Sequence, residues 1–169
     1  VIPAMDTADN LGHWQVIERA KKRLFYSLLR LSLPLATRNE DPAHGLRFEF
    51  LSDTAAAQPV LTGHENGIIT LALKEADDAE RERRRTSMHE PYRTLLGHFR
   101  HEIGHYYWDR LIRDEPERLS AFRALFGDER GDYEQALKSY YANGAPPDWQ
   151  QRHISAYATS HPWEDWDET

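Results

Sequence analysis

The hydrophobic positions of the chain first follow a helical period. Between Asp9 and Leu33, apolar residues recur mostly every three or four positions, with Arg and Lys between them. This spacing places the apolar side chains on one face of an α-helix, and Pro34 is typical of the residue that ends one. We therefore expect a long scaffold helix that packs against a sheet, with Asp9 or Asn10 as its N-cap.

Two shorter stretches carry the pattern of β-strands. Residues 46–51 alternate between apolar and polar side chains, and residues 68–73 are rich in β-branched and aliphatic ones. Asn66-Gly67, immediately before the second stretch, is a strong signal for a tight hairpin turn. The polar segment 37–44, which contains Pro42, is expected to be a loop.

Helices are expected in most of the remaining chain. The pattern places them over residues 76–88, from Pro91 to Ile112, over 117–126, over 132–141 and from Pro162 onward. Pro91 and Pro162 suit a first helical turn, where the amide hydrogens have no partner inside the helix. The sequence thus predicts an α+β fold, mostly helical with a small mixed sheet, in a single domain that spans residues 1–169.

The composition is that of a globular chain. Hydrophobic residues make up 40% and charged residues 29% of the 169 positions, and no apolar run is long enough to cross a membrane. The formal net charge of −7 disfavours a nucleic-acid partner, although the segment Arg81 to Arg85 is locally basic. The first residues form no secretory signal, so we expect a cytoplasmic protein. Because the chain opens on Val1, a fragment of a longer protein is the alternative.

The strongest chemical signal is the run His101-Glu102-Ile103-Gly104-His105. Residues four apart share a helix face, so the two histidines can offer two imidazole nitrogens to one metal ion. Glu102 lies about 100° around the helix and flanks the metal rather than binding it. This spacing is that of zinc hydrolases, in which the glutamate deprotonates a metal-activated water. Because the chain contains no cysteine, any metal must be held by His and carboxylate side chains.

A structural helix without a metal is the alternative interpretation of this run. Leu96, Phe99, Ile103 and Tyr107 form an apolar stripe on the side away from the two histidines. One face of the helix is thus expected to pack on the core while another carries His, Glu and His. A solvated helix would carry Lys and Glu pairs there instead, so the pattern favours the metal site.

The third ligand decides the type of site, because catalytic zinc uses three protein ligands and keeps one position for water or substrate. The residues after His105 exclude the tight spacing His-x-x-Gly-x-x-His. A carboxylate from a later helix is the remaining common solution. Glu164 and Glu168 stand four apart after Pro162 and would face the same way, so both are candidates. In the alternative, both belong to a solvated acidic tail.

These motifs resemble those of known proteins. The run His101–His105 resembles the zincin superfamily, and a later helix with a ligand Glu resembles its gluzincin branch. More closely, residues 63–70, 75–82, 98–108 and 161–166 resemble a bacterial family of zinc-binding metallopeptidases. This resemblance covers nearly the whole chain and implies a zincin-like catalytic domain with Zn²⁺ as its cofactor. The cysteine-rich zinc ribbon that usually precedes that domain is absent from this sequence.

The resemblance leads to a hypothesis about the catalytic residues. His101, His105 and Glu168 bind Zn²⁺, with Glu164 as the alternative third ligand. Glu102 acts as the general base for the attacking water and then gives the proton to the leaving amine. The substrate would be a peptide or a protein.

Supporting roles follow from the same hypothesis. Tyr157, His161 or His153 would polarise the oxyanion, a role that gluzincins give to Tyr or His. The side chain that orients a ligand histidine would be Asp165, Asp167 or Glu164. A zincin sheet has an edge strand beside the metal, and residues 68–73 are the candidate to pair there with a peptide.

Two other classes of function compete with the hydrolase. The same residues would serve a domain that binds zinc and a peptide or protein partner without turnover. An open metal position beside an accessible groove would favour the enzyme over this binding domain. The formal net charge of −7 argues against the third class, a nucleic-acid-binding module built on Arg81 to Arg85.

Overall fold

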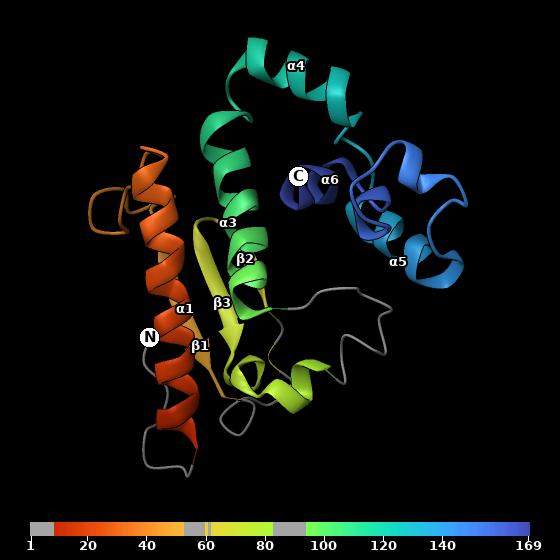
Figure 1. Ribbon diagram of the computed structural model, residues 1–169. Coiled ribbons are helices and arrows are strands. Elements are labelled where there is room, and N and C mark those ends of the chain that lie inside the picture. The colour runs from red at the N-terminus through yellow and green to blue at the C-terminus, as the bar shows by residue number, and fades with distance from the viewer. Residues whose placement is uncertain (1–8, 53–59, 61, 83–93) are drawn as a thin grey trace. The chain divides into compact units, whose positions relative to one another are not determined.

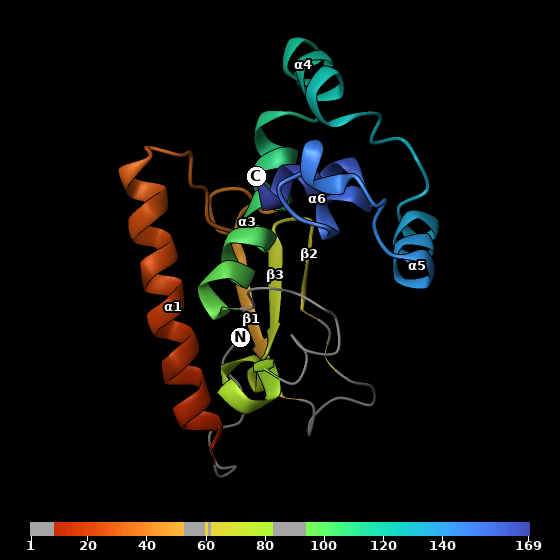
Figure 2. The same cartoon turned by 45° about the vertical axis from the view of Figure 1, so that its right-hand side comes forward.

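The computed structural model describes residues 9–52, 60, 62–82 and 94–169. The chain divides into two compact units, Val1–Glu102 and Ile103–Thr169, and the boundary falls inside one helix, α3 (Figures 1 and 2). The fold is mostly helical with a small mixed sheet, which confirms the α+β class. The single domain expected over residues 1–169 stays a prediction. Within the described ranges, no helix combines the length and the apolar character needed to cross a membrane.

The first unit contains the sheet, and the second is helical. The elements of the first are α1 (Asn10–Arg30), β1 (Arg47–Leu51), β2 (Gly63–Glu65), β3 (Ile68–Ala72), the 3₁₀ helix η2 (Leu73–Ala76) and the start of α3 (Leu95–Leu111). Those of the second are the rest of α3, then α4 (Pro116–Phe126), α5 (Tyr133–Asn143), the 3₁₀ helices η3 (Trp149–Gln151) and η4 (Tyr157–Thr159), and α6 (Pro162–Glu168).

Helix α1 begins where the apolar period predicts it but ends at Arg30, three residues before the predicted end at Leu33. Its buried face contains Ile17, Ala20, Leu24 and Leu28, which stand three or four residues apart. Asp9 is the N-cap residue, as expected, but its carboxylate makes no capping hydrogen bond. The backbone carbonyl of Asp9 accepts the first hydrogen bond of the helix, from the amide of His13 at 2.9 Å.

The sheet has three strands in the order β1-β3-β2, with β1 parallel and β2 antiparallel to β3. Phe48 and Phe50 of β1 project from one face, beside Ile69 and Leu71 of β3. Phe99 of α3 packs edge-on against both phenylalanines, with ring centroids 5.7 and 6.3 Å away. The start of the metal-motif helix is thereby anchored on the sheet.

The central place of β3 corrects one expectation. Residues 68–73 were expected at the edge of the sheet, free to pair with a peptide, but β3 has a partner strand on each side. That prediction is wrong because β2 has only three residues, too few to be recognised as a strand, and the hairpin turn brings it to the outer side of β3. Leu73 itself belongs to η2.

Other boundaries agree with the pattern. The helices α4 and α5 match the predicted ranges 117–126 and 132–141, and Pro162 is the first residue of α6. The carboxylate of Asp132 caps α5 by accepting a hydrogen bond from the amide of Gln135 at 2.9 Å. Residues 78–82 are helical and Ala76 belongs to η2, while Pro91 and residues 83–88 lie outside the described residues.

An aromatic cluster forms the core of the second unit. Trp108, Ile112 and Phe122 are buried at its centre, and Trp163 and Trp166 of α6 pack against them. The indole of Trp108 meets that of Trp163 edge-on at 5.2 Å between ring centroids. The aromatic residues near the C-terminus therefore fix α6 against the helices α3 and α4.

The β2–β3 turn gives a first test of the fold. Asn66 and Gly67 have φ angles of 48° and 82°, as the Asn-Gly signal predicts. A Cβ atom on Gly67 would also collide with the backbone carbonyl of His44. We expect Gly67→Ala to lower the free energy of unfolding by about 1–3 kcal/mol. The matched control is Gly63→Ala, whose added methyl group meets no atom within 4 Å. Equal urea midpoints for the two variants would contradict this account of the turn.

Candidate metal centre

Helix α3 carries the whole His-Glu-x-x-His run in its middle. The apolar side of the helix is buried, with Phe99 at 0% and Ile103 at 5% exposure. His101 and His105 are partly exposed and lie one turn apart on another face. Glu102 is also buried, at 8% exposure. The helix therefore has the two different faces that the sequence predicts.

Helix α6 brings buried carboxylates to this face. Pro162 occupies its first position, and the imidazole Nδ1 of His161 accepts a hydrogen bond from the amide of Trp163 at 3.2 Å, which caps the helix. Glu164 is fully buried, and the Asp167 side chain has no exposed surface. Acidic groups without exposure are rare unless they are paired or bind a metal.

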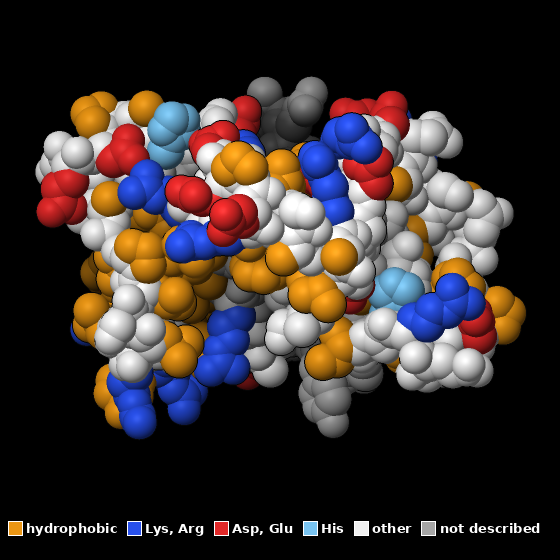
Figure 3. Space-filling view, turned by 90° about the horizontal axis from the view of Figure 1, so that it is seen from above, with side chains coloured by type: hydrophobic (Ala, Val, Ile, Leu, Met, Phe, Trp, Pro, Cys, Tyr) orange, Lys and Arg blue, Asp and Glu red, His pale blue; other side chains and the backbone are white. Residues whose placement is uncertain are grey.

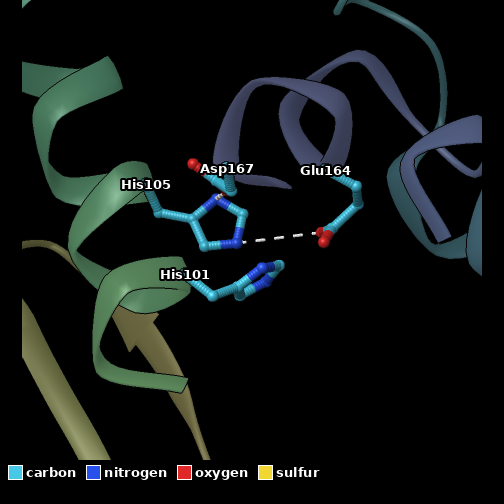
Figure 4. A group of neighbouring side chains, drawn as sticks. All are labelled: His101, His105, Glu164 and Asp167. Carbon is cyan, nitrogen blue, oxygen red and sulfur yellow. Dashed lines mark ion pairs between the residues drawn. The ribbon is translucent and has the colours of Figure 1, made fainter. Parts of the chain in front are cut away.

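His105 lies between these two carboxylates (Figure 4). Its Nδ1 is 2.5 Å from Oδ2 of Asp167, and its Nε2 is 3.7 Å from Oε1 of Glu164. A carboxylate at Nδ1 keeps the proton on that nitrogen, so the lone pair of a neutral imidazole is at Nε2. Nε2 is thus in the form that binds a metal, and it faces the second carboxylate.

The four side chains form one candidate set of metal ligands. His101, His105, Glu164 and Asp167 each offer a ligand atom, and these atoms all lie within 4.8 Å of one another. Figure 4 shows the two histidines on successive turns of α3 and the two acids on α6. Ligands held by tetrahedral zinc at about 2.0–2.2 Å are roughly 3.5 Å apart. The 3.7 Å between Nε2 of His105 and Oε1 of Glu164 fits that separation.

Glu164 is itself held in place by α5. The hydroxyl of Tyr133 donates a hydrogen bond of 2.5 Å to its Oε1. A buried carboxylate needs such donors, because it has lost its hydration. Tyr133 is thus part of the site, although it lies 31 residues before Glu164 and no motif marks it.

Comparison with known proteins agrees with this donor set. A family model described as "Putative zinc-binding metallo-peptidase" matches residues 10–169. The chain belongs to this metallopeptidase family. It is 52% identical, over 167 residues, to uncharacterized proteins of Mycobacterium bovis and of two strains of Mycobacterium tuberculosis. The match covers 99% of this chain and 48% of each relative, so the chain spans about half of their length. No solved structure is significantly similar to it.

In this member of the family, Glu168 lies outside the candidate ligand set. It is exposed at the end of α6, whereas Glu164, the alternative third ligand, is fully buried. The reason is the length of the helix. Glu164 and Glu168 do face the same way, but one helical turn separates them by about 5.4 Å along the axis. α6 has seven residues, so Glu164 lies on its buried first turn and Glu168 at its solvent-exposed end.

Among the three residues proposed to orient a histidine, Asp167 is the one that faces Nδ1 of His105. Asp165 is buried too, but its Oδ2 lies 3.7 Å from Nε2 of His153. Burial raises the pKa of Asp165, and the charge of His153 partly opposes that rise. His153 is therefore paired with Asp165 rather than gathered at the candidate site.

Tyr157 and His161, predicted to polarise the oxyanion, are both outside the ligand set. Burial raises the pKa of Tyr157 well above its usual range, and the Glu164 charge adds to the rise, so its phenol stays protonated and can donate. Burial lowers the pKa of His161, which keeps the imidazole neutral. Because its Nδ1 caps α6, the contacts of His161 are those of a structural residue. A catalytic role for either residue stays a prediction.

The carboxylate of Glu75 is buried near the start of α3, and it was not predicted from the sequence. Glu75 of η2 is 1% exposed, and its Oε2 lies 3.2 Å from Nδ1 of His98, one turn before His101 on α3. Sequence spacing gives no signal for this pair, because η2 and α3 are joined only through tertiary packing. The pair ties the start of α3 to η2.

Gly104 lets α6 come close to α3, and this gives a second test. A Cβ atom there would collide with the Asp167 carboxylate, and the indole N–H of Trp166 donates to the Gly104 carbonyl at 3.1 Å. We expect Gly104→Ala to destabilise the protein by about 1–3 kcal/mol in chemical denaturation. Gly97→Ala on the same helix meets only the Thr94 hydroxyl at 3.0 Å and gains helix propensity. A loss of stability in Gly97→Ala equal to that in Gly104→Ala would refute this packing account.

Proposed function

We propose that the domain is a zinc-dependent peptidase of the gluzincin type, acting on a peptide or protein substrate. The observation that carries the proposal is the placement of His105 between Asp167 at Nδ1 and Glu164 at Nε2. A histidine oriented by one carboxylate and facing a second one is the arrangement of a catalytic metal site. A purely structural ion pair would need only one acid.

The ligands in this proposal are His101, His105 and Glu164. Two imidazole nitrogens and one carboxylate oxygen are a donor set that suits zinc, and three protein ligands leave a position open. Asp167 orients His105, and Tyr133 orients Glu164 through its hydroxyl. When bound, zinc would supply a Lewis acid and lower the pKa of a water molecule toward neutrality.

The proposal gives Glu102 the proton transfers. It follows His101 directly on α3, is buried, and does not belong to the ligand set. Glu102 takes a proton from the attacking water and passes it to the leaving amine nitrogen. Tyr157 is the candidate donor to the developing oxyanion, because a phenol that stays protonated can donate a hydrogen bond there.

The direct test is Glu102→Gln in zinc-loaded protein, with an unstructured protein such as casein as substrate. We expect zinc content to stay at the wild-type level and hydrolysis to fall at least about 100-fold, because the amide cannot accept the proton. Glu168→Gln is the matched control, an exposed acid in which both zinc content and hydrolysis should be unchanged.

Each other outcome has a defined meaning. Hydrolysis by Glu102→Gln at the wild-type rate would remove Glu102 from the mechanism. Wild-type protein that binds zinc and a peptide but does not cleave it would refute the peptidase. The domain would then be a zinc-binding module that holds its partner without turnover.

A further inference from the structure

A basic hollow lies between α1 and the first half of α3, both within the first unit. It measures about 440 Å³ and is lined by Lys22, Arg23, Tyr26, Ser27, Leu96 and Arg100. Three of these side chains are cations, contributed by two different helices, and none of the described residues that line the hollow is acidic. In a chain with a formal net charge of −7, such a grouping stands out from its surroundings.

The three cations have no partner among the described residues. No side-chain hydrogen bond or ion pair within the described part of the chain involves Lys22, Arg23 or Arg100. The neighbouring Lys21 behaves differently, since its ammonium group lies 2.5 Å from the carboxylate of Glu18. Unneutralised cations that line a concave surface focus a positive potential into it. The hollow is therefore suited to an anionic group.

Apolar surface adjoins the basic hollow on α1. Tyr26 is 64% exposed, and the Arg30 guanidinium lies 5.9 Å from the centroid of its ring. Leu29 and Leu31 are 66% and 69% exposed at the same end of the helix. Figure 3 shows hydrophobic side chains at the left of the molecule, with basic ones below them and acidic ones above. Exposed Tyr and Leu beside charges are typical of a surface that contacts another polypeptide.

The hollow lies on another side of α3 than His101. Arg100 directly precedes His101 but lies about 100° around the helix from it. His105 shares the face of His101, one turn on, whereas Leu96 shares the face of Arg100. A ligand in the hollow would thus occupy a second binding site, on another side of the metal-motif helix.

We propose that this basic hollow binds an acidic polypeptide segment in which Glu or Asp alternates with apolar residues. The carboxylates contact Lys22, Arg23 and Arg100, and an apolar side chain packs on Tyr26 and Leu96. The occupant is a peptide rather than a nucleic acid, because the small hollow with its apolar rim suits a few side chains better than a phosphate backbone.

The test measures the fluorescence anisotropy of a labelled peptide of Glu-Glu-Leu repeats, titrated with the zinc-free protein. We expect saturable binding that weakens as salt rises, because the contacts are between exposed charges. The double variant Lys22→Glu and Arg100→Glu should bind about tenfold more weakly or worse. The control double variant, Lys138→Glu and Arg152→Glu, changes the net charge equally at exposed sites of the second unit and should bind like wild type.

Three results would overturn the proposal. The first is an equal loss in both double variants, which would show that total charge alone attracts the peptide. The second is tighter binding of a single-stranded oligonucleotide, lost in the hollow variant, which would assign the surface to nucleic acid. The third is the absence of peptide binding at low salt. Circular dichroism of each variant checks that these exposed substitutions leave the helices intact.

Discussion

The arrangement of the second unit depends on placing two carboxylates against one imidazole. Glu164 and the Asp167 side chain are without exposure, and both approach His105. Burying two acids at one place is costly, because each loses hydration and repels the other. The hydrogen bond from Tyr133 to Glu164 and the close approach of His105 to Asp167 offset part of that cost, and a divalent cation would offset much of the rest. The same two carboxylates, costly to bury, make this group a candidate metal site.

The neighbouring packing serves this arrangement. α6 has only seven residues and cannot form a stable helix alone, so its position is set by Trp163 and Trp166 in the aromatic core. Gly104 removes the side chain that would keep α6 away from α3. On the other side of the unit boundary, Phe99 anchors the same helix on the sheet through Phe48 and Phe50. Each element of the site is thus held by apolar contacts close to it in the same unit.

How far the sequence predicts this site depends on the range of each signal. His101 and His105 follow from helical spacing alone, and Pro162 correctly marks the start of α6. Spacing could not choose between Glu164 and Glu168, because a seven-residue helix shows no period that separates its buried end from its exposed one. The hydrogen bond from Tyr133 to Glu164 could not be predicted at all, because it depends on how α5 packs against α6. The fold class was predictable because it, like the two histidines, follows from local spacing along the chain. The order of the strands in the sheet was not predictable from that spacing.

Zinc content is the most direct measurement of the central claim that Glu164, not Glu168, completes the site with His101 and His105. Elemental analysis after reconstitution and dialysis would compare wild type with Glu164→Gln and Glu168→Gln. The account predicts about one zinc per chain in wild type and in Glu168→Gln, and a substantial loss in Glu164→Gln, because one ligand of three is removed. Zinc retained in Glu164→Gln and lost in Glu168→Gln would contradict it.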